Sequence, residues 1–340
     1  MKEKAPRKFK SATTMADVAA KVGVSRQLVS LVFRNANGVS PQTALKIRKA
    51  ALELGYSPNL AAQSLRRDGS KYIGVAYNSS HSSSHDLIPA LYRATGAHGF
   101  RLVLSMISTN HPEERAIEEL IGHRCDGLIL VSSELSSKRL KEISENSPVV
   151  SINRRVSGLN CGVVSSDGGA GIFEAVEFLT ELGHKSIAYV STPQMMENQF
   201  RLAGYEAAMA KSNLNSQIIV IESGYIESAG AIAGSILISK KTMPSAVVCS
   251  NDQVALGLIL TLAKAGIKIP KQISVIGFDD TVAKFPFLDL TTVHQDAVEL
   301  ADAAISNLIS RINNEKSPAT EVLTSAKLVI RSSTSKPRSN

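Results

Sequence analysis

The sequence predicts a multidomain protein, in which an all-α N-terminal unit precedes an α/β core of two parallel-sheet lobes. The chain has 340 residues, which is more than one typical domain needs. Residues 13–58 carry helical periodicity together with helix-capping signals. From residue 72 onward, short apolar runs alternate with amphipathic helices, a pattern typical of parallel sheets covered by helices on both faces.

Residues 18–33, VAAKVGVSRQLVSLVF, predict two short helices joined by a tight turn. Valines recur at helical spacing on both sides of Gly23, so each half presents one apolar stripe. Gly23 lies where the chain leaves one helix for the next, a place that requires positive φ. Thr14 and Asp17 have capping-box spacing, and Ser25 can cap the second helix. The pattern predicts a helix-turn-helix, and an α-hairpin that only fills a core is the alternative.

A third helix is predicted after the turn at Asn37-Gly38. Ser40 can cap this helix, Pro41 suits its first position, and Gly55 ends it. Three helices within about fifty residues make a small bundle that is marginally stable alone. The segment that follows, 59–71, contains two potential helical turns but too few apolar residues to hold a free helix, so we expect it to fold only against a partner.

The positive charge of the chain is concentrated at one end. Net charge is +8, and residues 1–71 hold 14 Lys and Arg against 4 Asp and Glu, whereas the remainder holds 24 against 26. A basic N-terminal fifth on a near-neutral body is typical of a protein whose one end contacts phosphates, and it favours DNA binding over a core-filling hairpin. Residues 1–12 are expected to be a basic, disordered N-terminus.

Nine short apolar runs predict the strands of the core: 72–77, 101–106, 126–131, 148–153, 161–164, 186–190, 217–221, 246–250 and 273–278. Helical stretches lie between most of them, as in the repeated βα pattern of parallel sheets. About 265 residues of this pattern are more than one sheet comfortably holds, so two α/β subdomains are expected.

Several other protein classes are excluded by pattern. No apolar run reaches transmembrane length, and the basic start is not followed by the apolar segment of a signal peptide, so we expect a cytoplasmic protein. Cys125, Cys161 and Cys249 form no CxxC pair and are expected as free thiols. Dinucleotide, Walker A and nucleophile-elbow motifs are missing, so neither an enzyme nor a cofactor is expected.

Several motifs in register resemble the LacI/GalR family of bacterial transcription regulators. The resemblance covers roughly residues 13–331, from TMADVAAKVGVSRQLVS through CDGLILV, ELGHKSIAYV, RLAGYEAAM, CSNDQVALG and ISVIGFDD to LTTVHQD. It implies a homodimer with a DNA-binding headpiece at 13–58, a hinge helix and linker at 59–71, and a periplasmic-binding-protein-like core at 72–331 whose two lobes close on an effector. Residues 332–340 are then a tail.

The resemblance also implies a DNA-binding set: Thr14, Ser25, Arg26, Gln27, Ser30, Asn59, Ala62 and Leu65. Arg26 and Gln27 lie at the start of the recognition helix, whose N-terminal residues face base edges in the major groove. There Arg26 can form two hydrogen bonds to guanine, and Gln27 can form two to adenine. Many relatives have Arg where this chain has Leu31, so one customary base contact is missing or apolar. Leu65 matches a hinge leucine that wedges into the minor groove, and linker packing is its alternative role.

The implied effector-binding set is Asn78, Asn153, Arg201, Tyr225, Asn251 and Asp279. Several of these positions follow strands, where ligands of open α/β sheets bind, although each can instead be a helix cap or a loop hydrogen bond. The loop with His81, His85 and Asp86 departs from the family pattern. It is too sparse for a metal site, and a polar mouth to the cleft or a solvated loop is favoured. No metal is expected, and a sugar or sugar phosphate is the default effector.

The sequence therefore predicts a cytoplasmic, dimeric, effector-gated DNA-binding regulator. The favoured role for this regulator is repression of a carbohydrate-use operon. Each headpiece reads half of a near-palindromic operator in double-stranded DNA, and the protein contacts no membrane. The alternative is a cytoplasmic sugar-binding protein that does not read DNA sequence. No heptad run follows the core, so no coiled-coil tetramerisation tail is expected.

Overall fold

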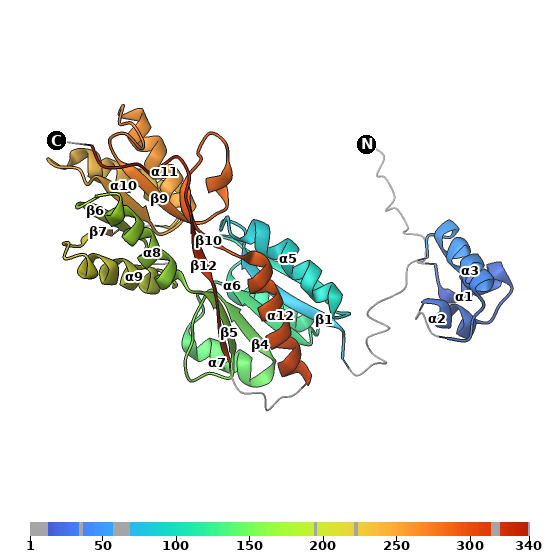
Figure 1. Ribbon diagram of the computed structural model, residues 1–340. Helices are drawn as coiled ribbons and strands as arrows, with labels where there is room; N and C mark the ends of the chain where they lie inside the picture. Colours follow the sequence, from blue (N-terminus) through green and yellow to red (C-terminus); the bar gives the residue numbers. More distant parts are fainter. Residues whose placement is uncertain are drawn as a thin grey trace, which may run out of the picture. The chain divides into compact units, whose positions relative to one another are not determined.

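A computed structural model describes residues 13–33, 37–56, 69–193, 196–220, 224–313 and 320–338. The chain divides into two compact units, Met1–Gly69 and Ser70–Asn340, which are drawn in Figure 1. The predicted disordered N-terminus at 1–12 and most of the predicted hinge and linker, including Asn59, Ala62 and Leu65, lie outside the described residues. Within the described ranges, no helix is long and apolar enough to cross a membrane.

The first unit is a three-helix bundle, made of α1 (Met15–Val22), α2 (Arg26–Phe33) and α3 (Pro41–Glu53). Its core is formed by apolar residues at helical spacing on all three helices: Val18, Ala19, Val29, Val32, Ile47, Ala50 and Ala51. Each helix contributes one stripe to this core, so the opposite faces of all three helices remain in solvent.

The predicted helix ends of the bundle are confirmed. The Thr14 hydroxyl accepts from the backbone N–H of Asp17, whose carboxylate accepts from the backbone N–H of Thr14 at 2.7 Å. Gly23 ends α1 with φ of 76°, in the left-handed region that glycine adopts without strain. The Ser25 hydroxyl accepts from the backbone N–H of Leu28 at 3.1 Å and so caps α2.

The second unit contains two lobes, each built around a six-stranded sheet. Lobe 1 has the strand order β11-β5-β4-β3-β1-β2, and all of its neighbouring strands are parallel. Its elements are β1 (Tyr72–Asn78), α5 (Ser84–Ala97), β2 (Arg101–Ile107), α6 (Glu113–Gly122), β3 (Gly127–Val131), α7 (Ser137–Asn146), β4 (Val149–Ile152), β5 (Gly162–Ser166), α12 (Ala297–Asn313) and β11 (Glu321–Thr324).

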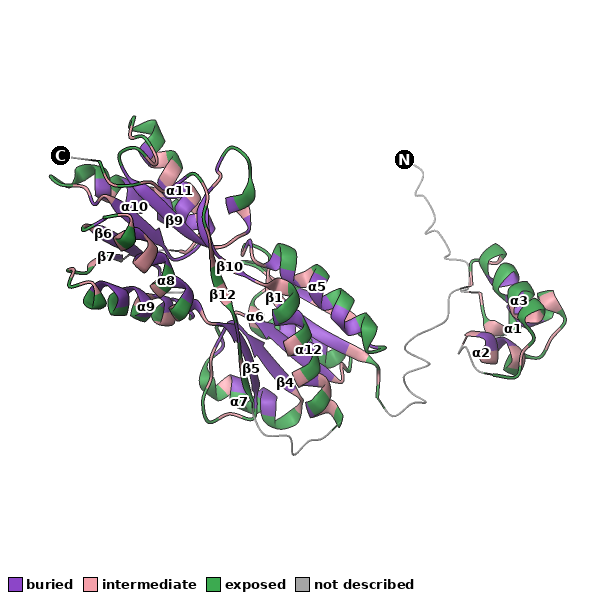
Figure 2. Ribbon diagram, in the orientation of Figure 1, coloured by how far each residue is buried: buried purple, intermediate pink, exposed green. Residues whose placement is uncertain are grey.

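Lobe 2 has the strand order β12-β10-β9-β8-β6-β7, in which only the edge strand β12 is antiparallel to its described neighbour. Its elements are α8 (Gly168–Glu181), β6 (Ile187–Ser191), α9 (Asn198–Lys211), β7 (Gln217–Val220), α10 (Glu227–Ser239), β8 (Ala246–Cys249), α11 (Asp252–Lys264), β9 (Ser274–Asp279), the 3₁₀ turn η1 (Val282–Lys284), β10 (Thr291–Gln295) and β12 (Ala326–Val329). The sheets of both lobes are buried between helices whose outer faces are exposed (Figure 2).

The chain passes between the lobes three times: from β5 into α8, from β10 into α12, and from β11 into β12. Figure 1 shows β12 running along the junction. All nine predicted strands are present, but β10, β11 and β12 were not predicted as strands, because they are only four or five residues long and none contains an apolar run of more than two residues. The late strands and α12 tie the lobes together, so neither lobe is a continuous stretch of chain.

Residues beyond 331, predicted as a tail, contact lobe 2. The Ser333 hydroxyl donates to the backbone oxygen of Val275 at 2.6 Å and accepts from the backbone N–H of Thr291 at 2.8 Å. The backbone oxygen of Ser335 lies 2.8 Å from Nε2 of the buried His184. This segment therefore packs along the strands of lobe 2 as part of the fold.

Two glycines set how closely α10 and α11 cross. A Cβ on Gly230 would overlap the backbone oxygen of Val254, and a Cβ on Gly257 would overlap the backbone oxygen of Glu227. Because both obstacles are backbone atoms, no side-chain rotation relieves them. The two helices therefore approach each other along a surface that only glycine permits.

Replacing Gly257 by alanine is expected to destabilise the second unit by about 3 kcal/mol, because α10 and α11 must move apart. The matched control is Gly96→Ala in α5, where an added Cβ meets no atom within 4 Å. That change is expected to be neutral or to stabilise by about 0.5–1 kcal/mol, through helix propensity. Urea unfolding followed by circular dichroism measures both, and equal stabilities of the two variants would contradict the close crossing.

Candidate functional site

The start of α2 presents polar side chains to solvent. Arg26 and Gln27 are its first two residues and are exposed, while Ser30, one turn later, is half-buried. Ser25 is exposed as well, but its hydroxyl is engaged as the cap of α2, and the hydroxyl of Thr14 is engaged in the capping box of α1. Of the five described members of the predicted DNA-binding set, Arg26 and Gln27 are thus the ones that extend long side chains from a helix N-terminus, the part of a recognition helix that contacts base edges.

The orientation of α2 is fixed by packing behind this exposed face. Val29 and Val32 are buried in the bundle core. Phe33 at the end of α2 contacts Tyr56 edge to face, with ring centroids 5.3 Å apart. Because the buried side of α2 is packed, its exposed side is presented as a rigid surface, which is what positioned base contacts require.

A cavity of about 550 Å³, partly open to solvent, lies between the two lobes of the second unit. Both lobes line it, mostly from loops at the carboxyl ends of strands: His81, Ser82, Ser83, Ser132, Glu134 and Asn153 from lobe 1, and Met196, Glu197, Arg201, Tyr225, Asn251, Gln253, Asp279 and Gln295 from lobe 2. A molecule bound in this cavity would therefore touch both lobes.

Five of the six residues predicted for effector binding line this cavity: Asn153, Arg201, Tyr225, Asn251 and Asp279. The sixth, Asn78, is not among the lining residues. Its side-chain oxygen accepts from the backbone N–H of Ser80 at 3.0 Å, and its amide nitrogen lies 3.5 Å from the Tyr225 hydroxyl. Asn78 thus contacts the Tyr225 side chain from lobe 1, behind the cavity wall.

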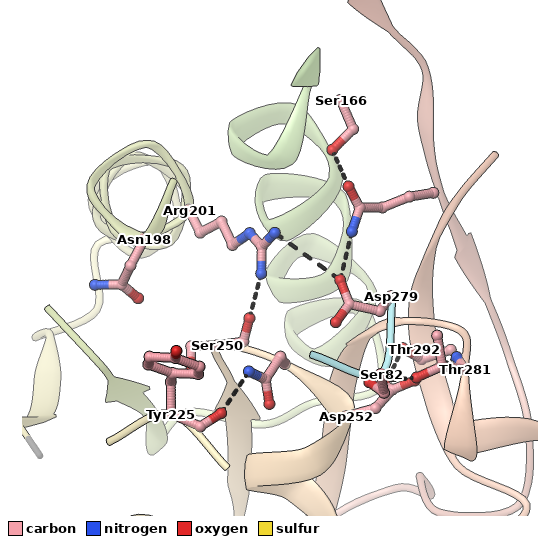
Figure 3. Close-up of polar contacts among 12 residues, drawn as sticks. Ser82, Ser166, Asn198, Arg201, Tyr225, Ser250, Asp252, Asp279, Thr281 and Thr292 are labelled. Atoms are coloured by element: carbon pink, nitrogen blue, oxygen red, sulfur yellow. Dashed lines mark hydrogen bonds and ion pairs between the residues drawn. The ribbon is translucent and has the colours of Figure 1, made fainter. Parts of the chain in front are cut away.

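Arg201 is at the centre of a buried polar network (Figure 3). One of its terminal nitrogens donates to the backbone oxygen of Ser250 at 2.5 Å, and the other lies 4.0 Å from Oδ1 of Asp279. The guanidinium also lies over the Phe278 ring, 3.6 Å from its centroid. Asp279 accepts from Nε2 of Gln295 as well. The network holds the charged groups of lobe 2 in fixed positions at the cavity wall.

Asn251 uses its side chain within the protein. Its oxygen accepts from the backbone N–H of Val254 at 2.8 Å as the cap of α11, and its amide nitrogen donates to the backbone oxygen of Tyr225 at 2.9 Å. The Tyr225 ring in turn meets His81 of lobe 1 edge to face, with centroids 4.7 Å apart. The geometry gives Asn251 the helix-cap role that the sequence left as its alternative, and it positions the Tyr225 loop beside the cavity.

Three of the lining residues have a strained backbone. Ser132 after β3, Asn153 after β4 and Asp279 at the end of β9 have φ values of 49°, 55° and 112°. Positive φ costs a non-glycine residue on the order of 1–3 kcal/mol, and such residues concentrate at ligand-binding sites. Their shared position around one cavity supports its assignment as a binding site.

The two lobes also contact each other directly beside the cavity. The side-chain oxygen of Gln253 accepts from the backbone N–H of Ser82 at 3.1 Å, and its amide nitrogen donates to the backbone oxygen of Ser80 at 3.2 Å. The Thr281 hydroxyl donates to the Ser82 hydroxyl at 2.9 Å. These hydrogen bonds join the loop after β1 to lobe 2, so a change in the angle between lobes must break or form them.

Two buried carboxyl groups lie together in lobe 2. Burial, and secondly the charge of Asp279, raise the pKa of Asp252 to about 7. Burial also raises the pKa of Asp279 to about 6, although the Arg201 guanidinium acts in the opposite direction. Asp252 accepts from the backbone N–H of Thr281 at 2.8 Å and from the hydroxyl of Thr292 at 2.6 Å, which fixes its position beneath the cavity.

The raised pKa of Asp252 predicts a pH-dependent stability. Because its folded-state pKa exceeds the unfolded value of 3.8, its contribution to the free energy of unfolding is fully present below about pH 4 and is lost as the pH rises through about 7. The melting temperature of Asp252→Asn relative to the unsubstituted protein should therefore be higher at pH 8 than at pH 5. Glu118→Gln, on the exposed face of α6, is the control. The same difference at both pH values would contradict the assignment.

The residues weighed as metal ligands are not brought together. His81 lines the cavity and burial lowers its pKa to about 4, His85 is exposed, and Asp86 pairs with Lys284 at 3.2 Å. Within the described part of the chain no group of three or more His, Cys, Asp or Glu residues is arranged to hold a metal ion. The loop instead forms one side of the cavity, as the polar-mouth alternative proposed.

Sequence reasoning did not propose several lining residues as effector contacts, among them Glu134, Glu197, Gln253 and Gln295. Glu134 follows β3 and Gln295 ends β10. Because ligands of open α/β sheets bind at the carboxyl ends of strands, both residues could have been predicted from their positions. Gln253 and Glu197 lie at the starts of helices, where a polar residue is first interpreted as a capping residue.

Two family models match this chain. Residues 14–59 match the model for bacterial regulatory proteins of the lacI family, and residues 176–334 match the model of a periplasmic binding protein-like domain. The first match covers the helical unit, and the second covers most of lobe 2 and the late crossings between lobes.

Curated relatives and solved structures match along nearly the whole chain. The ribose operon repressor of Escherichia coli K12 is 32% identical over 308 residues, 88% of this chain and 93% of the relative. The HTH-type transcriptional regulator AscG of the same organism is 31% identical over 309 residues, which are 87% of this chain and 91% of AscG. A crystal structure of the Lac repressor dimer bound to operator and the anti-inducer ONPF matches with a TM-score of 0.80 and 26% sequence identity. The match covers 96% of this chain and 100% of the repressor chain.

The matched relatives cover both parts of this structure. These parts are the helical unit with its exposed helix α2 and the two-lobed core with a cavity between its lobes. The resemblance, the fold class and the non-enzymatic character predicted from the sequence are confirmed. The chain belongs to the lacI family of bacterial regulatory proteins, and it is a DNA-binding transcription regulator rather than an enzyme.

Proposed function

We propose that this protein is an effector-gated repressor of a carbohydrate-use operon, which binds a palindromic operator as a homodimer in the cytoplasm. The observation that carries the proposal is the cavity of about 550 Å³, lined from both lobes, on the same chain as an exposed recognition helix. A ligand that touches both lobes binds one lobe angle better than another, and this difference in affinity is what shifts a conformational equilibrium.

At the DNA end, Arg26 and Gln27 are the proposed base readers. A bidentate arginine–guanine or glutamine–adenine contact discriminates by about 1–3 kcal/mol. Exposed lysines on α3, such as Lys46 and Lys49, add positive charge without lying in the bundle core. These side chains support phosphate contacts, which position a headpiece without reading sequence.

Gating is proposed to act through the segment at 59–71, which joins the two compact units. Its sequence has too few apolar residues to hold a helix alone, so it suits an element that forms only when two copies meet on DNA. A change in lobe angle that separates the two copies of this segment would then release the operator.

The proposed homodimer is supported by exposed apolar side chains along one edge of lobe 1. β2 is the edge strand of its sheet, and Met106 on β2, Tyr92 on α5 and Ile121 on α6 are 45–51% exposed. Lobe 2 adds Phe285 and Phe287, stacked with centroids 5.8 Å apart and also exposed. Clustered apolar exposure and an open sheet edge are typical of surfaces that a partner covers.

The effector is proposed to be of sugar type. Similar solved structures include the Lac repressor bound to ONPG, at 26% identity and a TM-score of 0.80, and the regulator CelR with cellobiose, at 25% and 0.69. The ribose operon repressor is a curated relative. In this chain, the acceptors Glu134, Glu197 and Asp279 in the cavity suit hydroxyl-rich ligands.

The salt dependence of DNA affinity tests the proposal. A dimer that makes six to ten phosphate contacts loses about 10³–10⁵ in affinity between 50 and 200 mM salt, because counterions are released from the DNA. Fluorescence anisotropy with a labelled duplex of about 40 base pairs measures the slope. No measurable binding at either salt concentration, or equal affinity for every duplex sequence tried, would contradict the proposal.

A further inference from the structure

Lobe 2 has a basic surface at the amino ends of its strands. The strands β6, β8 and β9 are parallel neighbours, so the segments that lead into them meet at one edge of the sheet. There the backbone N–H of Ser245 donates to the backbone oxygen of Ser186, and that of Ser274 donates to the oxygen of Ser245, both at 2.9 Å. The interlobe cavity is lined mostly from the carboxyl ends of strands, so this edge lies at the opposite end of lobe 2.

The segment after β12 crosses the same edge. The backbone N–H of Ser335 donates to the hydroxyl of Ser274 at 3.1 Å. Pro337 lies beside Gly183, where an added Cβ would be 3.7 Å from the proline ring. Lys336 is therefore held between two anchored residues, and Figure 1 shows this part of the chain at the end of lobe 2 that is far from lobe 1.

Eight exposed cations lie in these segments or at the end of the helix that leads into one of them, and together they form the basic end of lobe 2: Lys185, Lys240, Lys241, Lys264, Lys268, Lys271, Lys336 and Arg338. None of the eight forms an ion pair within the described residues. The segments 182–186, 240–245, 265–273 and 333–338 contain no Asp or Glu, and the one acid adjacent to them in the sequence is Glu181. The charge of the basic end is therefore almost uncompensated.

The rest of the core has the opposite charge. Residues 72–340 hold 24 Lys and Arg against 26 Asp and Glu, and the basic end with Glu181 accounts for eight of the cations and one of the acids, which leaves 16 against 25. On lobe 1 the exposed cations are interleaved with acids and pair with them, as Arg139 does with Glu114 and Glu142. An interleaved surface is typical of a solvated face, whereas a patch of one sign produces a field that attracts an oppositely charged partner.

The composition of the basic end suits phosphates. Seven of its eight cations are lysines, which bind phosphate as point charges, and the exposed Thr242 adds a hydroxyl donor. Lysine is depleted at protein–protein interfaces, where aromatic anchors carry much of the affinity. The four segments contain no Phe, Tyr or Trp, and their one histidine, His184, is buried. They therefore offer neither an anchor for a protein nor a stacking platform for unpaired bases, and the backbone of duplex DNA is the polyanion that fits.

We infer that the basic end of lobe 2 is a second DNA-binding surface, which contacts the phosphates of duplex DNA without reading its sequence. The chain enters the core from the N-terminal unit at β1 of lobe 1, so this surface belongs to the other lobe. It allows one molecule to hold a second duplex, or a distant stretch of the same one, while α2 is bound to an operator. The inference goes beyond the proposed function, which assigns DNA binding to the headpiece alone.

Capture of a second duplex by a protein–operator complex tests this inference. The operator is first identified by selection of the full-length protein on random duplex DNA, and is then immobilised and saturated with the protein. A labelled duplex of unrelated sequence is added after washing. We expect capture at about 50 mM salt and capture at least about tenfold weaker at about 200 mM, because counterions are released when lysines neutralise phosphates.

The double variant Lys240→Gln/Lys241→Gln should lose most of this capture. The matched control is Lys138→Gln/Lys141→Gln, which removes two exposed cations from α7 of lobe 1 and should retain it. Both variants should keep the operator affinity and the melting temperature of the unsubstituted protein, because all four side chains are exposed and lie outside the N-terminal unit. Operator binding without capture, or equal capture by the two variants, would overturn the inference and leave the proposed function intact.

A second measurement does not require an operator. Analytical ultracentrifugation of the full-length protein with excess unrelated duplex at low salt counts the duplexes bound per dimer. We expect more than one for the unsubstituted protein and the control, and fewer for Lys240→Gln/Lys241→Gln. If selection yields no operator, the proposed function fails, and this count still decides the inference. Vesicles with about 30% phosphatidylglycerol are the other polyanion tested, and vesicle binding that is lost in the same variant, without binding of a second duplex, would overturn the assignment to DNA.

Discussion

Replacing Arg26 by alanine is expected to lower operator affinity about 10- to 100-fold, because a bidentate arginine–guanine contact contributes about 1–3 kcal/mol of discrimination. Arg26 is exposed in the first turn of α2, whereas the core of the bundle is made by other side chains. The melting temperature should therefore be unchanged. The operator is first identified by selection of the protein on random duplex DNA, and fluorescence anisotropy on that operator measures the loss of affinity. Repeating the selection with the variant shows whether the base preference weakens at one position.

A matched control is Arg115→Ala, which removes one positive charge from the exposed face of α6 in the second unit. If Arg26 reads a base, the two substitutions differ in operator affinity and in the selected sequence. If Arg26 contacts only phosphates, affinity falls equally on all sequences and the selected consensus is the same as before. The latter outcome would contradict its assignment as a base reader.

Replacing Arg201 by alanine is expected to abolish the response to effector, with a loss of at least 100-fold in effector affinity. The substitution removes the guanidinium and also leaves Asp279 buried without its cation, which typically destabilises by about 3–5 kcal/mol. The melting temperature of the second unit should fall with it. Operator binding without effector is expected to persist wherever the protein remains folded, because α2 belongs to the other compact unit.

Arg201→Lys keeps the test decisive if the alanine variant does not fold. Lysine retains the charge beside Asp279 but has no planar fork, so it cannot serve Ser250 and Asp279 in the same geometry. We expect a folded protein with effector affinity about tenfold weaker or more. Wild-type effector affinity in both variants would contradict the placement of the effector against Arg201.

The features that the sequence predicted well are local. The capping box at Thr14 and Asp17, the left-handed turn at Gly23 and the cap at Ser25 depend on residues within a few positions of each other, so spacing alone predicts them. The nine apolar strands are predictable for the same reason, since burial on both faces requires a continuous apolar run.

The features that it missed depend on contacts between distant residues. Gln253 bonds the loop at Ser80 and Ser82, more than 170 positions away, and Gln295 bonds Ser166 at a separation of 129. No periodicity in the sequence encodes such pairs. The strands β11 and β12 were missed because they are four-residue edge strands that are largely not buried, so neither carries a long apolar run. The predicted DNA contacts at Asn59, Ala62 and Leu65 lie outside the described residues and stay predictions.

The central claim is that one chain reads a DNA sequence and that a small molecule controls this reading. Selection of the full-length protein on random duplex DNA, followed by sequencing, tests it most directly when it is run with and without a panel of sugars and sugar phosphates. The account predicts enrichment of a short palindrome whose recovery changes with one compound of this panel. Enrichment of no sequence under any condition would contradict it, and α2 would then be only a well-capped helix of a small bundle.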